Sequence, residues 1–190
     1  MTDRHATTGR DLIAVVRAAL DAGLPAVQLR DKDLPGRPLL VLAEQLRSET
    51  ARTGALLFVN DRIDVALAAG ADGVHLGGGS LPAEVARGLL GSAALIGVST
   101  HVPGEASAGA DFVFFGPVWE TPSKSGTQGE TRLAEAVRQA TVPVLAIGGV
   151  TPARVAAARA AGAAGVAVIR AILSAADPAT ATRALLVELG

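Results

Sequence analysis

Residues 56–80 read LLFVNDRIDVALAAGADGVHLGGGS. An apolar run ends in Asn60 and Asp61, a helical segment then closes at Ala69-Gly70, and a second apolar run ends in glycines. A glycine that closes a helix, followed by a strand that is apolar on both faces, is typical of a buried parallel strand. The stretch therefore predicts one strand–helix–strand unit of a parallel α/β protein.

The same pattern extends over the rest of the chain. An Ala-Gly pair closely followed by an apolar run occurs at Ala22-Gly23, Ala69-Gly70, Ala108-Gly109 and Ala161-Gly162. Strands are predicted at Ala26–Leu29, Leu56–Val59, Gly73–Leu76, Leu95–Val98, Phe112–Phe115, Val144–Ile147 and Gly165–Ile169. Helices are predicted at Asp11–Leu20, Leu39–Ala51, Ile63–Ala69, Pro82–Leu90, Leu133–Ala140, Pro152–Ala161 and from Asp177-Pro178 onward. Between these elements we expect a turn at 34–38, a short helix before Phe112 and a long functional loop at 116–130.

Seven strands are one fewer than a closed (β/α)8 TIM barrel needs. The shortfall lies at the start, where Thr2-Asp3-Arg4 resembles the polar end of a strand whose body is absent. We expect a single barrel domain over residues 1–190 whose first strand is missing or truncated. An open seven-stranded sheet is the alternative. If the first strand is indeed missing, we expect the natural chain to start upstream of Met1.

The composition excludes several classes of protein. The net charge of −1 argues against general nucleic-acid binding and against an acidic membrane as partner. The absence of cysteine excludes disulfides and thiol chemistry, so a metal would need oxygen or imidazole ligands. No apolar stretch approaches the roughly 20 residues that span a bilayer, and the first ten residues are too polar for a signal peptide. We expect a cytoplasmic protein, and the oligomeric state stays open.

Polar residues follow the predicted strands at the point where each strand ends. Because parallel α/β folds bind ligands at the carboxyl ends of their strands, these residues should meet. Their types predict an anion site, and the set comprises Gln28, Arg30, Lys32, Asn60, Asp61, His75, Ser99, His101 and Lys124. Gly148-Gly149 followed by Thr151-Pro152 adds a small cradle of backbone donors.

Six motifs in order resemble the family of thiamine phosphate synthase and its relative, the thiazole tautomerase TenI. The motifs are QLRDKDL at 28–34, VNDRIDVALAAGADGVHLG at 59–77, IGVSTH at 96–101, GADFVFFGPVWETPSKSG at 109–126, VPVLAIGGV at 142–150 and AGAAGVAVIRAI at 161–172. The resemblance implies a (β/α)8 barrel. It also implies a reaction in which an aminopyrimidine methyl diphosphate loses pyrophosphate and the thiazole phosphate nitrogen attacks the resulting cation, which gives thiamine phosphate.

The resemblance also implies roles for individual residues. The diphosphate would contact Arg30, Lys32, Asn60, Ser99 and Lys124, of which all but Asn60 would be catalytic. Gln28 would lie near the pyrimidine, and Asp61 would hold Mg²⁺, because a departing pyrophosphate needs positive charge nearby. The thiazole phosphate would contact Thr121, Ser123, Gly148, Gly149, Ile169 and Arg170, although the family usually has serine where Arg170 stands.

One departure from the family pattern keeps the activity open. Ser80 stands where synthases carry the aspartate that is their second magnesium ligand, and it is predicted to cap the next helix instead. The TenI branch has similar serine-containing sequences there, whereas Lys32, Asp61 and Pro117 match the synthase pattern. A metal-free TenI-like tautomerase and a non-catalytic binder of phosphorylated ligands are therefore the alternatives. The roles of His75, as core residue or catalyst, and of His101, as loop residue or proton carrier, also stay open.

Overall fold

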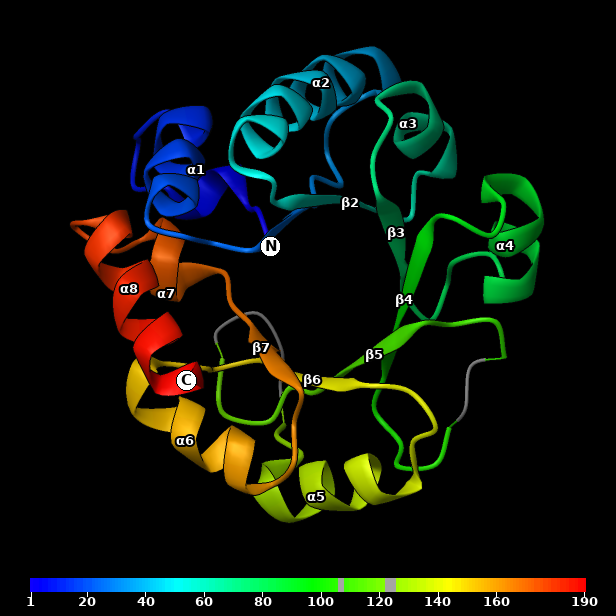
Figure 1. The fold of residues 1–190 in the computed structure, drawn as a ribbon, viewed down its shortest axis with the longest axis vertical. Helices are drawn as coiled ribbons and strands as arrows, with labels where there is room; N and C mark the ends of the chain where they lie inside the picture. The colour runs from blue at the N-terminus through cyan, green and yellow to red at the C-terminus, as the bar shows by residue number, and fades with distance from the viewer. Residues whose placement is uncertain (106–107, 122–125) are drawn as a thin grey trace.

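The structure is a computed structural model that describes residues 1–105, 108–121 and 126–190. The described residues form one parallel sheet in which each strand pairs with the next along the chain. Its strands curve around a central axis, and the helices lie on the outside (Figure 1). The strands are β1 (Ala26–Leu29), β2 (Leu56–Asn60), β3 (Gly73–Leu76), β4 (Leu95–Thr100), β5 (Phe112–Phe115), β6 (Val144–Ile147) and β7 (Gly165–Ala167).

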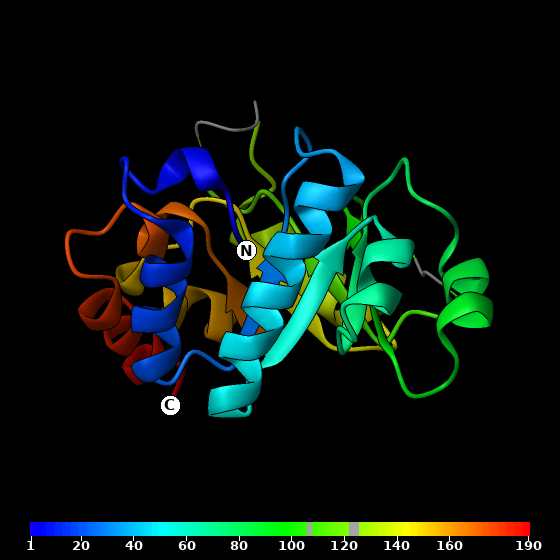
Figure 2. The same cartoon turned by 90° about the horizontal axis from the view of Figure 1, so that it is seen from above.

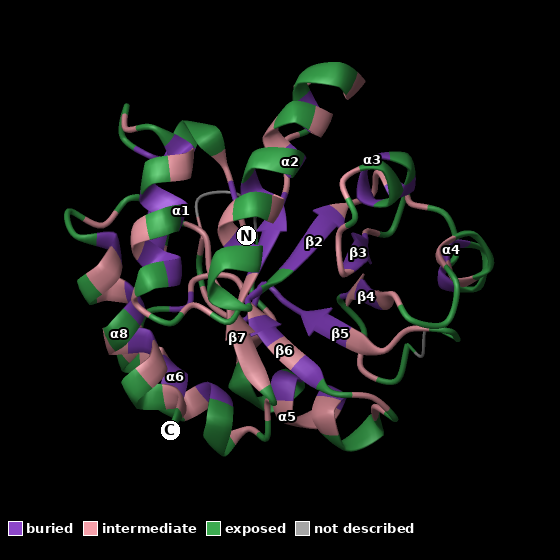
Figure 3. Ribbon diagram, turned by 45° about the horizontal axis from the view of Figure 1, so that its top comes forward, coloured by how far each residue is buried: buried purple, intermediate pink, exposed green. Residues whose placement is uncertain are grey.

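The helices cover the outer face of the sheet. They are η1 (Arg4–Ala6), α1 (Leu12–Asp21), α2 (Gly36–Thr53), α3 (Ile63–Ala68), α4 (Ala83–Leu90), α5 (Gly129–Gln139), α6 (Pro152–Ala160), α7 (Arg170–Leu173) and α8 (Pro178–Leu189). α1 packs against α2, and α8 packs against both α1 and α6 (Figures 1 and 2). Burial concentrates on the strands and on the helix surfaces that face them (Figure 3). No helix of the described residues is long and apolar enough to cross a membrane.

Most predicted strands are confirmed, and their ends differ for identifiable reasons. β2 and β4 run on to Asn60 and Thr100, so their last polar residues still belong to the sheet. β7 is shorter than predicted and stops at Ala167, because the chain bends at Ile169 to start α7. The Ile169 carbonyl accepts the Leu173 N–H at 2.9 Å, which closes the first turn of this short unpredicted helix.

Three predicted connections need correction. The turn expected at 34–38 is mostly the first turn of α2, where Pro38 needs no N–H bond. The loop expected at 116–130 ends earlier, because α5 already begins at Gly129. The short helix expected before Phe112 is absent from the described residues on either side of 106–107.

The chain before β1 contains no strand in the structure, as expected. Met1 and Thr2 instead cross the space between the two edge strands of the sheet. The Met1 nitrogen donates to the Val168 carbonyl at 3.0 Å, and the Thr2 N–H donates to the Gln28 carbonyl at 2.8 Å. The observed fold is therefore a parallel α/β fold with a seven-stranded curved sheet, in which β1 and β7 do not pair directly.

Close packing of adjacent strands depends on glycine at one buried position. Gly73 opens β3, and a Cβ atom there would lie 2.0 Å from the backbone oxygen of Leu95 on β4. We expect Gly73→Ala to lower the free energy of unfolding by about 3 kcal/mol, since the strands would have to separate. Gly88→Ala on α4, where a Cβ meets nothing within 4 Å, should be neutral or stabilising by up to about 1 kcal/mol. Urea denaturation of both variants tests this account, and equal stabilities would contradict it.

Candidate active site

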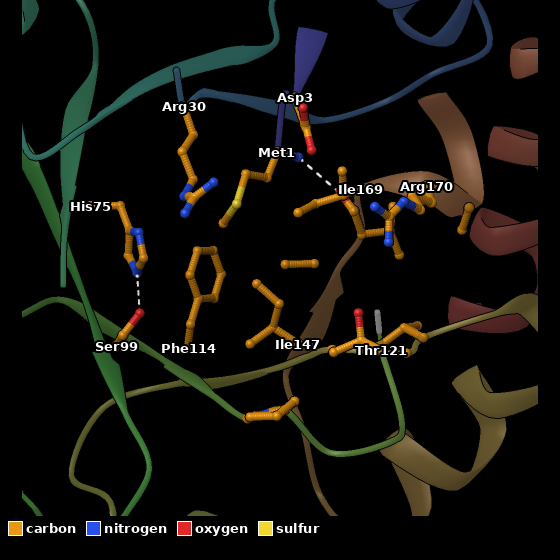
Figure 4. A pocket seen from close by; sticks show the side chains of 18 of the residues that line it. Met1, Asp3, Arg30, His75, Ser99, Phe114, Thr121, Ile147, Ile169 and Arg170 are labelled. Atoms are coloured by element: carbon orange, nitrogen blue, oxygen red, sulfur yellow. Dashed lines mark hydrogen bonds between the residues drawn. The ribbon is translucent and has the colours of Figure 1, made fainter. Parts of the chain in front are cut away.

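A cavity of about 500 Å³ lies at the carboxyl ends of the strands (Figure 4). Almost every strand contributes to its wall through its last residues or through the loop that follows it. Twelve of the residues that were predicted for the site line this one cavity: Arg30, Lys32, Asn60, Asp61, His75, Ser99, His101, Thr121, Gly148, Gly149, Ile169 and Arg170. The sequence-based prediction that these strand ends converge is thus borne out in space.

Three predicted residues are not among these twelve. Ser123 and Lys124 lie outside the described residues. Gln28 is buried behind the wall, where it lines a second, mostly apolar cavity on the inside of the sheet. Its side-chain oxygen has no hydrogen-bond partner among the described residues. Its amide nitrogen reaches Asn60 and His75, so Gln28 contacts residues of the wall rather than forming the wall itself.

Asp61 is the most heavily hydrogen-bonded acidic residue of the cavity. Its backbone is left-handed, with φ 61°, and its N–H donates to the His75 carbonyl at 2.9 Å. One carboxylate oxygen accepts the Ser80 hydroxyl and the Gly77 N–H, and the other accepts Asn60 Nδ2 at 2.6 Å. Burial opposes ionisation, but these hydrogen bonds and nearby Lys32 together hold the pKa of Asp61 below its usual value. The carboxylate is therefore ionised at neutral pH.

The structure corrects the role predicted for Ser80. Ser80 was expected to cap the following helix, but α4 begins after Pro82 and receives no side-chain cap. The Ser80 oxygen instead accepts the Gly77 N–H at 2.7 Å while its hydroxyl donates to Asp61. Ser80 thus closes the glycine-rich turn after β3 onto the carboxylate, a long-range contact that local sequence rules do not contain.

A row of polar side chains continues from Asp61 along the inner face of the sheet. Gln28 Nε2 lies 3.2 Å from Asn60 Oδ1 and 3.0 Å from His75 Nδ1. His75 Nε2 lies 3.0 Å from the Ser99 hydroxyl oxygen (Figure 4). The imidazole is 4% exposed and packs against Phe114, with ring centroids 4.5 Å apart. His75 is therefore a buried, hydrogen-bonded residue at the base of the cavity.

Positive charge gathers where β1 ends. Arg30 points into the cavity in Figure 4, and Lys32 lies on the same wall. The neighbouring carboxylates are engaged elsewhere, because Asp31 pairs with Arg4 at 2.8 Å and Asp33 faces His5 at 3.6 Å. Among the described residues, neither Arg30 nor Lys32 has a salt bridge of its own. Their charge is thus available to an anion.

A second anion-binding arrangement follows β6. Gly148 and Gly149 have φ values of 93° and 66°, and a Cβ at Gly149 would lie 2.4 Å from the Glu120 carbonyl. α6 then begins at Pro152, and the free N–H groups at a helix start attract phosphate. Arg154, which the sequence analysis missed, binds the Gly149 carbonyl at 2.6 Å and lies over the Trp119 ring. The sequence signal that could have identified Arg154 is its position in the first turn of the helix that follows the glycine pair.

Cationic side chains lie in two separate regions of the one cavity. Arg30, His75 and Ser99 lie on one side of the view in Figure 4, and Thr121 and Arg170 lie on the other. Arg30 and Lys32 supply positive charge to one region and Arg170 to the other, Asp3, Asp61 and Glu120 also line the cavity, and Phe114 and Ile147 supply apolar surface between the two regions. Such a cavity suits two phosphorylated molecules whose ring systems meet in the middle.

Comparisons with known proteins agree with this geometry. The family model described as thiamine monophosphate synthase matches residues 1–172. A putative thiamine-phosphate synthase of Geobacter sulfurreducens is 55% identical and is aligned over 100% of this chain and 92% of its own length. The thiamine-phosphate synthase of Roseiflexus castenholzii is 47% identical over 97% of this chain and 84% of its own.

A solved structure is similar throughout. Thiamine phosphate pyrophosphorylase from Pyrococcus furiosus superposes with a TM-score of 0.90 at 36% identity, covering 99% of this chain and 92% of that one. A 3-hexulose-6-phosphate synthase has a TM-score of 0.69 at 22% identity, which shows a shared fold only. The sequence match over most of the chain and the superposition together establish that the chain belongs to the thiamine monophosphate synthase family.

Proposed function

We propose that this chain is a thiamine-phosphate synthase, a transferase that joins aminopyrimidine methyl diphosphate to thiazole phosphate and releases pyrophosphate. The observation that carries the proposal is one cavity lined by Arg30 and Lys32 after β1 and by the glycine pair after β6, in a chain that belongs to this family. The Arg30–Lys32–Ser99 region would hold the diphosphate, and the Gly148–Gly149 cradle with Ile169, Arg170 and Thr121 would hold the thiazole phosphate. Ser123 and Lys124 keep the roles that the family resemblance gives them.

The chemistry follows from this placement. The bond between the methylene carbon and the diphosphate oxygen breaks, and its electron pair leaves with the oxygen. Negative charge grows on the diphosphate, where Arg30, Lys32 and the Ser99 hydroxyl stabilise it. The thiazole nitrogen then donates its lone pair to the methylene carbon and forms the new C–N bond. Holding both rings in one cavity supplies the orientation that this attack needs.

Gln28 suits recognition of the pyrimidine. Its buried side-chain oxygen lacks a partner among the described residues, and an unpaired buried acceptor is unfavourable. An amino group on the pyrimidine is the kind of donor that would satisfy it. The role rests on this unpaired oxygen and on the family resemblance.

The residues present fit Mg²⁺ with one carboxylate. Asp61 accepts three hydrogen bonds, and an ionised carboxylate has about four acceptor positions, so one position remains. Mg²⁺ commonly binds through one or two carboxylates together with substrate phosphates and water. No group of three potential metal-ligating residues occurs in the part of the chain that is described. Asp61 would hold the ion only with the diphosphate, and the bound ion would neutralise charge on the leaving group.

One observation favours the tautomerase alternative. The Ser80 hydroxyl donates to Asp61 and offers no second carboxylate, which suits a TenI-like enzyme that works without metal. The retained cations and Asp61 favour the synthase over both this alternative and a non-catalytic binder. We further propose that the fold functions as a (β/α)8-type barrel. We expect the protein to act in the cytoplasm on phosphorylated small molecules, without nucleic acid or membrane.

The direct test is incubation of the purified chain with both substrates and Mg²⁺. A synthase forms thiamine phosphate and pyrophosphate in equal amounts, and both are measured against time. A parallel incubation with the thiazole carboxylate phosphate alone detects tautomerisation. Isomerised thiazole without thiamine phosphate would establish the tautomerase instead, and no product in either reaction would leave a binder.

The first prediction from the proposed function concerns the metal. Ser80→Asp should lower the Mg²⁺ concentration at half-maximal rate by about tenfold, because a second carboxylate strengthens the site. Asp61→Asn should lower turnover at least about 100-fold, since the charge that holds the ion is lost. Asp64→Asn, three residues away and paired with Arg62 on the surface, is the matched control and should behave like the parent. Full synthase activity in the presence of a chelator would contradict the metal assignment.

The second prediction concerns the glycine cradle. Gly149→Ala should raise the KM for thiazole phosphate at least about tenfold, because the new Cβ displaces backbone that lines the cavity. The KM for the pyrimidine diphosphate should change much less. Gly70→Ala is the control, since Gly70 has a similar φ of 61° but open space around it and lies away from the cavity. Equal changes in both KM values would place the thiazole phosphate elsewhere.

A further inference from the structure

Five side chains between β1 and β4 form one continuous hydrogen-bonded row. Its order is Asp61, Asn60, Gln28, His75 and Ser99, and the donor–acceptor distances between successive members run from 2.6 to 3.2 Å. All members except Gln28 line the cavity, and Gln28 and His75 are both buried. Because each member can donate only through particular atoms, the direction of every hydrogen bond in the row can be deduced.

The direction begins at Asp61. Its carboxylate takes three hydrogen bonds and can give none while it is ionised. Asn60 must therefore turn its amide nitrogen toward Asp61, at 2.6 Å. This leaves the Asn60 oxygen facing Gln28, so the neighbour on that side has to be a donor.

Gln28 transmits this direction to the histidine. Its amide nitrogen carries two hydrogens, which go to Asn60 Oδ1 at 3.2 Å and His75 Nδ1 at 3.0 Å. A reversed Gln28 amide would place its oxygen against the Asn60 oxygen, which is two acceptors in contact. His75 Nδ1 is therefore an acceptor and carries no proton.

The tautomer of His75 then determines the direction in which the Ser99 hydroxyl proton points. A neutral imidazole without a proton on Nδ1 has its N–H on Nε2, which lies 3.0 Å from the Ser99 oxygen. Ser99 accepts that hydrogen bond, so its own O–H points away from His75. Among the described residues this is the only side-chain hydrogen bond of Ser99, and the residue lines the cavity. The hydroxyl proton is thus left for a ligand in the cavity.

We propose that His75 is a positioning residue, held as the neutral Nε2–H tautomer, which directs the Ser99 hydroxyl proton at the bound diphosphate. This inference rests on the proposed function, because the diphosphate is the anion that the proton would meet. Without His75, the Ser99 hydroxyl can rotate, and its proton no longer points in one fixed direction. A donor fixed beforehand stabilises growing negative charge without reorganisation at the moment of reaction.

The tautomer is measured first, on the protein without ligand. Long-range ¹H–¹⁵N NMR of ¹⁵N-histidine-labelled protein separates the two neutral tautomers and the charged ring. The chain has three histidines, so the signals of His75 are assigned by their loss in His75→Gln and by a His5→Gln control. We expect an Nε2–H pattern for His75 at neutral pH. An Nδ1–H pattern or a charged ring would overturn the proposal.

The action through Ser99 is measured with pyrophosphate as the probe. By calorimetry, Ser99→Ala should weaken pyrophosphate binding about tenfold or more, the usual effect of losing a hydrogen bond to a charged group. His75→Phe should weaken it about fivefold when Ser99 is present and less than about twofold in the Ser99→Ala background. His75→Gln, which keeps an N–H near the serine, should stay within about threefold of the parent. Equal losses from His75→Phe in both backgrounds would show that His75 does not act through Ser99.

These measurements are independent of turnover. If the chain makes no thiamine phosphate, the proposed function fails. The NMR pattern and the pyrophosphate affinities of the single and double variants still decide the role of His75. If thiamine phosphate is formed but the losses of pyrophosphate affinity from His75→Phe and Ser99→Ala are additive, the positioning role of His75 is disproved while the proposed function stands. His5→Gln, which is exposed and outside the cavity, should leave pyrophosphate binding and synthesis unchanged. Should His75→Phe fail to fold, the tautomer of the unaltered protein and His75→Gln still test the proposal.

Discussion

Parallel pairing of all the strands is the constraint on which the rest of this structure depends. Because each strand runs the same way as its neighbour, all of them finish at the same end of the sheet. Residues that are more than 100 positions apart in the chain, such as Arg30 and Gly148, therefore line one cavity. The apolar strands supply the stability, and the residues that follow them are free to be charged or strained. Function in this fold is accordingly concentrated where regular structure ends.

Asp61 is the residue through which that cavity is organised. Its left-handed backbone and its three hydrogen bonds connect the end of β2 to the glycine-rich turn after β3. The same carboxylate orients Asn60 and so begins the row that ends at Ser99. A single ionised group thereby serves as the proposed metal ligand and as the origin of the hydrogen-bond directions. Ser80 adds a neutral hydroxyl to this arrangement, so that Asp61 has no second carboxylate beside it.

The sequence predicted the strands and the convergence of their ends well, because Ala-Gly pairs and unbroken apolar runs are local signals. It failed where a residue's partner lies far away in the chain. Ser80 was predicted to cap a helix because serine is common just before helices, and its neighbours in the sequence do not indicate that Asp61 lies across the turn. Strand alternation placed Gln28 on the same side as Arg30 and Lys32, but it could not indicate that the side chain is buried against Asn60 and His75. α7 was missed because four residues are too few to give a helical period.

If one cavity holds two phosphate groups in separate regions, a crystal structure of the protein with pyrophosphate, Mg²⁺ and thiamine phosphate will show both of them bound. We expect pyrophosphate against Arg30, Lys32 and Ser99, with the ion on Asp61. We expect the phosphate of thiamine phosphate against Gly148, Gly149 and the start of α7. Both anions in one region, or pyrophosphate bound away from Ser99, would contradict this placement.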